Sequence, residues 1–128
     1  MEIKSYRGLL IWQKSMLLAK QVYQLSQSFP KEETYGLTNQ IRRACVSVPS
    51  NIAEGHARRS SAEFRNFLSI ANGSLAEVDT QQQLAADFGY ITTSESQSLC
   101  NLIIELRKMI TALQSKLSAK AQEVGNGK

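Results

Sequence analysis

The stretch VSVPSNIAEGHARRSSAEF, Val46 to Phe64, decides how this chain folds. Up to about Arg58, apolar residues recur every three or four positions, a spacing that predicts an amphipathic helix. Just beyond, Ser60 and Glu63 have the spacing of a capping box, in which two side chains satisfy free backbone amides of a first helical turn. The stretch therefore contains the end of one helix, a tight junction and the beginning of the next helix.

Pro49 stands inside the first of these two helices, which we expect to run from about Glu33 to Arg58. A proline in a helix interior removes one backbone hydrogen bond and crowds the carbonyl four residues earlier, here that of Cys45. The apolar stripe nevertheless continues in phase across the proline. We therefore expect one helix kinked at Pro49 and not two separate helices. The stripe consists of Leu37, Ile41, Ala44, Cys45, Val48 and Ile52.

The same periodicity predicts three further helices, and strand-like alternation is absent. Phe29-Pro30 ends the first helix, because a residue before proline avoids the helical region. Gly89 fits a C-terminal cap, and Thr92 with Glu95 repeats the capping-box spacing. The expected helices span about Tyr6 to Ser28, Ser60 to Phe88 and Thr93 to Ala119.

Four helices joined by short connections predict an all-α fold, an antiparallel up-down-up-down four-helix bundle. The length of 128 residues is that of one domain, and a chain of this size can bury a stable core. We expect the bundle to occupy residues 1–120 and the patternless residues 121–128 to fray. Gly73 lies inside the third helix at a cost of about 1 kcal/mol against alanine, so we expect a packing reason for it.

The first helix is more apolar than the edge of a monomeric bundle requires. Trp12 belongs to one apolar stripe, Ile11 and Leu18 belong to a second, and Leu10 and Leu17 fall on a third side. An edge helix needs only one such stripe. We therefore expect a second face of this helix to be buried against another subunit. Scattered surface leucines are the alternative, because exposed apolar residues are common.

The composition narrows the possible classes of protein. Hydrophobic residues make up 42% and charged residues 20%, which is ordinary for a soluble globular domain. No apolar run approaches the roughly 20 residues that span a bilayer, so no membrane partner is expected. Cys45 and Cys100 are too few for a disulfide framework or a zinc site, and reduced thiols indicate a cytoplasmic protein.

The usual enzymatic patterns are missing. A di-iron bundle needs Glu-x-x-His on two helices, whereas His56 is the single histidine. Neither a G-x-S-x-G nucleophile elbow nor a glycine-rich phosphate loop is present. Glu54 and Glu77 could act as an acid pair only if their helices bring them together. We therefore expect neither a catalytic activity nor a cofactor.

Five polar residues follow one another at spacings of four, four, three and four: Arg43, Ser47, Asn51, Glu54 and Arg58. On a straight helix they form one row, which we place opposite the core stripe. The row is either a solvated face or a hydrogen-bonded strip at a subunit contact. In the second case, Asn51 and Glu54 could also satisfy backbone groups freed by Pro49, and we favour this interpretation.

Arginines gather around the junction. Between Ile41 and Phe67 the chain has five arginines and two glutamates, so this window alone carries +3 of the net charge of +4. Arginine clusters suit phosphate recognition, which predicts RNA or DNA binding, and a ring of subunits would sum their fields. The alternative is a solvated helix corner, since few aromatic residues interleave to stack on bases. The candidate residues are Arg42, Arg58, Arg59 and Arg65.

Several motifs in this order resemble a known family. They are WQKSM at Trp12, FPKEE at Phe29, YGLTNQIRR at Tyr35, SVPSNIAEG at Ser47 and SLAEVDTQ at Ser74. The chain from about residue 9 to residue 91 resembles the four-helix-bundle proteins encoded in 23S rRNA intervening sequences. That family includes the accessory variability protein of diversity-generating retroelements.

The resemblance implies a bundle that assembles into a homopentameric, barrel-like ring without catalytic activity. Retroelement members of the family have a basic surface and associate with nucleic acid and a reverse transcriptase. We therefore expect a non-catalytic homo-oligomer that binds RNA or DNA through a basic surface. A scaffold that binds a partner protein, without nucleic acid, is the alternative.

Overall fold

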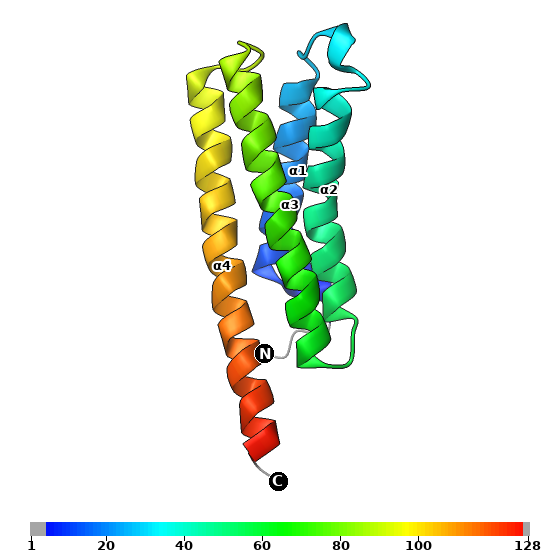
Figure 1. Cartoon of the computed structure of the whole chain (residues 1–128), viewed down its shortest axis with the longest axis vertical. Coiled ribbons are helices and arrows are strands. Elements are labelled where there is room, and N and C mark those ends of the chain that lie inside the picture. The colour runs from blue at the N-terminus through cyan, green and yellow to red at the C-terminus, as the bar shows by residue number, and fades with distance from the viewer. Residues whose placement is uncertain (1–4, 127–128) are drawn as a thin grey trace.

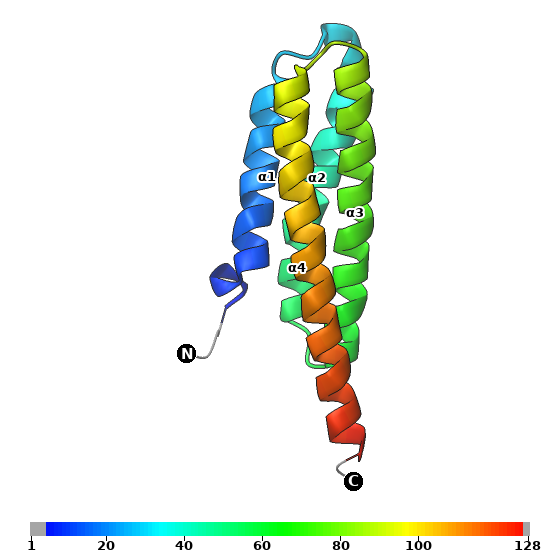
Figure 2. The same ribbon diagram turned by 90° about the vertical axis from the view of Figure 1, so that its left-hand side faces the viewer.

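The computed structural model describes residues 5–126, and the side chains of residues 5–120. Each helix runs antiparallel to the next, and together they form an elongated bundle (Figures 1 and 2). Every helix packs on two neighbours, α1 closing the bundle against α4, and the contact between α2 and α3 is the most extensive. The elements are η1 (Tyr6–Gly8), α1 (Leu10–Ser26), η2 (Lys31–Glu33), α2 (Leu37–His56), α3 (Ser61–Asp87) and α4 (Thr93–Asn126). The predicted all-α four-helix bundle is confirmed.

The core follows the predicted apolar stripe of α2, all of whose members are buried. In α1, the stripe that contains Ile11 and Leu18 faces the core, whereas Leu10 and Leu17 are exposed by about half. Two buried serines also lie on the core face of α1, where their hydroxyls donate to backbone carbonyls of the same helix. The largest fully buried side chains are Leu18, Ile41, Ile52, Leu68, Leu75, Leu99, Ile103, Leu106 and Ile110.

Helix α2 runs through Pro49 without a break, and the proline side chain is buried. A bend of its axis at that point stays a prediction. The helix begins at Leu37 and not at Glu33, because residues 31–33 form a separate 3-10 turn and Gly36 has a non-helical backbone. The Glu33 carboxylate nevertheless caps the helix, because its Oε1 accepts a hydrogen bond from the Leu37 amide at 3.2 Å.

Helix α1 is also shorter than the periodicity predicts. It begins at Leu10 and not at Tyr6, because Leu9 has an extended backbone that separates it from the preceding 3-10 turn. That turn places the Tyr6 ring 5.3 Å from the Trp12 ring, centroid to centroid, and the Arg7 guanidinium 5.6 Å from the Trp12 centroid. Trp12, a predicted interface residue, is thus partly covered within its own chain.

The loop between α3 and α4 has the predicted caps. Gly89 has φ of +80°, a left-handed conformation that favours glycine, and the amides of Gly89 and Tyr90 donate to Ala86 and Ala85 in a Schellman motif. The Thr92 amide donates to Glu95, and the Glu95 amide donates to Thr92, which completes the capping box. At α3, Ser60 accepts from the Glu63 amide at 3.1 Å, which forms the first half of the other box.

Close helix approach depends on Gly55 and not on Gly73. A Cβ at Gly55 would lie 2.6 Å from Cβ of Phe67, so only glycine lets α2 and α3 meet there. A Cβ at Gly73 would meet nothing within 4 Å. The predicted packing reason for Gly73 is therefore absent from the contacts among the described residues.

Helix α4 is longer than predicted, since it continues from Ala119 to Asn126. It extends beyond the junction of α2 and α3 at the lower end of the bundle (Figures 1 and 2). Residues 127 and 128 lie outside the described residues, and fraying of the last turns stays a prediction. Within residues 5–126, no helix has the length and apolar character needed to cross a membrane.

Candidate functional site

The predicted polar row of α2 lies along its seam with α3. A shift of 100° per residue places the row only about a third of a turn from the core stripe, so its middle meets the neighbouring helix. The hydroxyls of Ser47 and Ser74 are 2.8 Å apart, and the Asn51 amide donates to the carbonyl of Ser47 at 2.7 Å. A placement opposite the core is therefore wrong for Ser47 and Asn51, which are partly buried.

Asn51 does satisfy a backbone group near Pro49, although not the expected one. The carbonyl that loses its partner to a proline at position 49 belongs to Cys45. The Asn51 side chain reaches the carbonyl of Ser47 instead. Glu54 contacts Arg58 and not the backbone around the proline.

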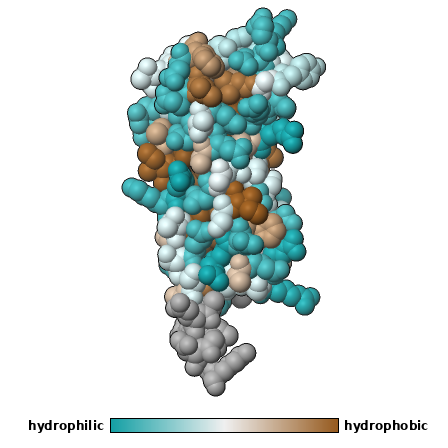
Figure 3. All heavy atoms as spheres, in the orientation of Figure 1, coloured by the Kyte–Doolittle hydropathy of each residue, from teal (hydrophilic) through white to brown (hydrophobic). Residues whose placement is uncertain are grey.

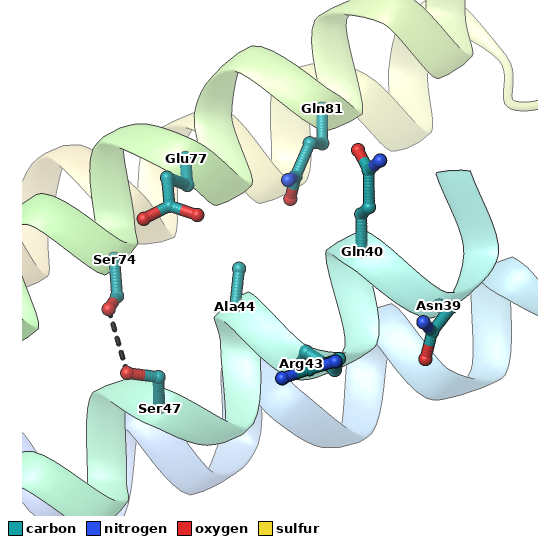
Figure 4. A pocket seen from close by; sticks show the side chains of 8 residues that line it. All are labelled: Asn39, Gln40, Arg43, Ala44, Ser47, Ser74, Glu77 and Gln81. Carbon is teal, nitrogen blue, oxygen red and sulfur yellow. Dashed lines mark hydrogen bonds between the residues drawn. The ribbon is translucent and has the colours of Figure 1, made fainter. Parts of the chain in front are cut away.

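A polar groove of about 340 Å³ opens beside this seam (Figure 4). Arg43 from α2 and Glu77 from α3 both border it, on opposite walls. Glu54 lies about three turns further along α2 than Arg43 and does not line the groove, so Glu54 and Glu77 do not form an acid pair. The lining residues are Asn39, Gln40, Arg43, Ala44, Ser47, Ser74, Glu77 and Gln81.

Arg58 and Arg59 lie at the junction of α2 and α3, as predicted. The Arg58 guanidinium forms an ion pair with Glu54 at 2.8 Å, one helical turn away, and lies 5.0 Å from the centroid of the Phe67 ring. Both partners of the ion pair are about half exposed, so solvent screens their attraction. Arg59 is exposed at the beginning of the loop that leads to Ser60.

Arg65 lies in the first turns of α3 at the same end of the bundle, where it faces α4. Its Nη1 donates to the Ser118 hydroxyl at 3.0 Å, and its backbone carbonyl accepts from the Gln114 amide at 3.2 Å. Its Nε is buried and has no hydrogen-bond partner within the described residues. The sequence reasoning missed Ser118 and Gln114, although their spacing of four on α4 indicates a shared face.

Arg42 does not join the other three arginines. It lies about 21 Å along the axis of α2 from His56, the last residue of that helix before the junction, at 1.5 Å per residue. Its guanidinium faces α1, where Nε donates to the Ser26 hydroxyl at 2.8 Å and the Cζ atom stands 4.7 Å from the centroid of the Tyr23 ring. Arg42 therefore links α1 to α2 and is no part of the arginine cluster at the junction.

Two lysines that the sequence reasoning left aside also lie at this end of the bundle. Lys116 and Lys120 flank Ser118 on α4, and both are exposed. We call Arg58, Arg59, Arg65, Lys116 and Lys120 the basic end. Among the residues whose side chains the structure describes, Glu54 and Glu63 are the acids next to it in sequence, so five cationic groups there face two acidic ones.

The two thiols differ in their surroundings. Burial raises the pKa of the Cys45 thiol to about 11, so this thiol is protonated at neutral pH. Cys100 is partly exposed and borders a groove between α3 and α4. Among the described residues, no group of three or more His, Cys, Asp or Glu side chains could hold a metal ion.

Comparisons with known proteins agree with the fold and the motifs. The family model described as 23S rRNA-intervening sequence protein matches residues 7–112. A crystal structure from Bacteroides thetaiotaomicron, of a protein with unknown function from the S23 ribosomal protein family, is similar with a TM-score of 0.76. It shares 25% sequence identity, and the match covers 82% of this chain and 98% of that one. No curated protein matches the sequence. Because the family match extends over most of the bundle, this chain belongs to the 23S rRNA-intervening sequence protein family.

Proposed function

We propose that this protein is a non-catalytic, cytoplasmic homo-oligomer that binds RNA or DNA through its basic end. The observation that carries the proposal is the presence of five cationic side chains, from the α2–α3 junction, α3 and α4, at one end of the bundle. Arginine and lysine bind phosphates without reading sequence, so the expected contact is with the nucleic-acid backbone.

Assembly would strengthen this contact. A ring needs two different surfaces on each subunit, because its contacts run head to tail. Leu10 and Leu17 are exposed on α1, and Ile70 and Leu84 are exposed on α3. These helices stand at opposite corners of the bundle (Figure 2). Such a pair of apolar faces supports a ring, and the number of five subunits comes from the family resemblance.

The face over α3 has further room for contacts. Its hydrophobic side chains lie in separate patches among hydrophilic ones (Figure 3). The polar groove with Arg43 and Glu77 lies between α2 and α3, so α3 also forms one of its walls (Figure 4). A mixed surface of this kind is typical of protein interfaces, whose apolar core is surrounded by a polar rim.

A titration with structured RNA and with duplex DNA, at low and at moderate salt, tests the binding. We expect affinity to fall steeply with salt, and Arg58→Ala/Arg59→Ala to flatten the slope. Arg107→Ala/Lys108→Ala is the matched control, since it removes two neighbouring exposed charges from the middle of α4. No binding at low salt, or equal slopes for both double variants, would contradict the proposal. The protein would then be a scaffold for a partner protein.

Native mass spectrometry tests the assembly. Leu17→Ser should lower the oligomeric fraction, because it removes an exposed apolar side chain from the proposed α1 contact. Ile104→Ser is the matched control, because Ile104 is similarly exposed on α4, outside both proposed faces. A monomeric wild type, or equal dissociation of the two variants, would refute this route of assembly.

A further inference from the structure

A second groove lies between α3 and α4 and shares Arg65 with the basic end. Its volume is about 430 Å³, and it is separate from the groove between α2 and α3. One side chain in it is charged, that of Arg65, and no carboxylate lines it. The lining residues are Ala62, Arg65, Asn66, Ser69, Gln114 and Ser118.

The hydroxyl groups of this groove have protons to donate. The Ser118 oxygen accepts from Arg65 at 3.0 Å, and the Ser69 oxygen accepts from the Gln114 amide at 2.9 Å. Neither hydroxyl donates to another described residue. A serine hydroxyl carries one proton and two acceptor positions, so both protons remain available to a bound acceptor.

The Arg65 guanidinium adds a cationic donor whose bonding is incomplete. Its Nη1 is fixed by Ser118, whereas Nε is buried without a partner within the described residues. A buried donor without a partner is unfavourable, so an acceptor that reached Nε would be favoured there. The groove thus combines one positive charge with two free hydroxyl protons.

We propose that this groove binds a phosphoryl group, in the nucleic-acid complex one phosphate of the backbone. A phosphate has several acceptor oxygens and negative charge, which match the donors of Arg65, Ser69 and Ser118. The proposal deepens and rests on the proposed function, because it names the ligand group at one residue of the basic end. Arg65 is then a specific phosphate ligand, whereas Arg58 and Arg59 contribute to the general field.

A titration of the ¹⁵N-labelled full chain with inorganic phosphate, at constant ionic strength, tests the site. The NMR signal of Arg65 Nε–H, assigned from its loss in Arg65→Lys, should shift saturably, while that of exposed Arg59 should not. Ser118→Ala and Ser69→Ala should each weaken binding about tenfold, since hydrogen bonds to charged groups are the strong ones. Ser115→Ala on the exposed side of α4 should change nothing, and thermal unfolding should show that each variant is folded.

The outcomes separate this site from the proposed function. No saturable shift of the Arg65 signal, or equal affinity in all three serine variants, would overturn the phosphate site. If RNA still binds with a slope that depends on Arg58 and Arg59, nucleic-acid binding stands without it. A saturable, serine-dependent shift without any RNA or DNA binding would support the phosphate site and overturn the nucleic-acid function.

Discussion

The two ends of the bundle use their polar side chains in opposite ways. At the upper end in Figure 1, the loops before α2 and before α4 contact each other through Glu33 and Tyr90. Glu33 accepts from the Leu37 amide with one oxygen and from the Tyr90 hydroxyl with the other, at 3.2 and 3.0 Å. The Tyr90 ring also packs between Phe29 and Phe88. Glu33 and Tyr90 thus satisfy each other's polar groups within the chain.

The lower end has cationic groups in excess over their partners. Arg58 pairs with Glu54, but Arg59, Lys116 and Lys120 are exposed, and Nε of Arg65 has no hydrogen-bond partner among the described residues. A surface that satisfies its own polar groups has little to offer a ligand, whereas an excess of donors favours an anionic one. The contact between Glu33 and Tyr90 is thus structural, and the excess of donors at the lower end is what supports the proposed binding there.

The largest expected effect on stability concerns the packing of α2 against α3 near the lower end. Gly55→Ala should lower the free energy of unfolding by about 1–3 kcal/mol, because the new methyl group would overlap with Phe67 and separate α2 from α3. Gly73→Ala is the matched control and should raise it by about 0.5–1 kcal/mol, since its methyl group meets nothing. Urea denaturation measures both. Similar effects of the two variants would show that the close approach at Gly55 is not needed.

At the upper end, Glu33→Ala should lower the free energy of unfolding by about 1 kcal/mol. The variant leaves the Leu37 amide at the beginning of α2 without its acceptor. Glu32→Ala removes the neighbouring exposed carboxylate and should change stability little. If Glu32→Ala costs as much as Glu33→Ala, the effect is one of charge and not of the cap. Neither variant should alter RNA binding, because both residues lie far from the basic end.

The parts of the fold that depend on neighbouring residues could be predicted from the sequence. The apolar stripes and the Thr92–Glu95 capping box involve residues within one or two helical turns of each other. The beginning of α2 could not be predicted, because it depends on the backbone that Gly36 adopts and on the Glu33 side chain reaching forward. Contacts between helices could not be predicted either. The periodicity of the sequence does not distinguish Gly55, where an added Cβ would meet Phe67, from Gly73, where it would meet no neighbour.

In the candidate site too, contacts within one helix could be predicted from the sequence, whereas contacts between helices could not. The ion pair of Glu54 and Arg58 follows from their spacing of four, and the structure contains it. Arg65 and Ser118 are 53 residues apart in sequence, so their contact emerges only when α3 and α4 are placed side by side. Arg42 was grouped with the other arginines by its place in the sequence, yet the turn of the helix directs it toward Tyr23 of α1. Charge counting thus locates a basic region without showing which arginines share a surface.

The smallest expected effect is the pH dependence of the contact between Tyr90 and Glu33. The hydrogen bond to the Glu33 carboxylate raises the pKa of Tyr90 above its usual value near 10, because the bond holds the phenol proton. A raised pKa in the folded state contributes stability that is complete below about pH 10 and is lost as pH rises through the folded pKa. In Glu33→Gln, the ultraviolet absorbance of tyrosinate should therefore develop at lower pH than in the wild type, with Tyr90→Phe identifying the Tyr90 contribution. If Glu33→Gln leaves the Tyr90 titration unchanged, the carboxylate does not hold the phenol proton, and the upper end would no longer differ from the lower one in how it satisfies its polar groups.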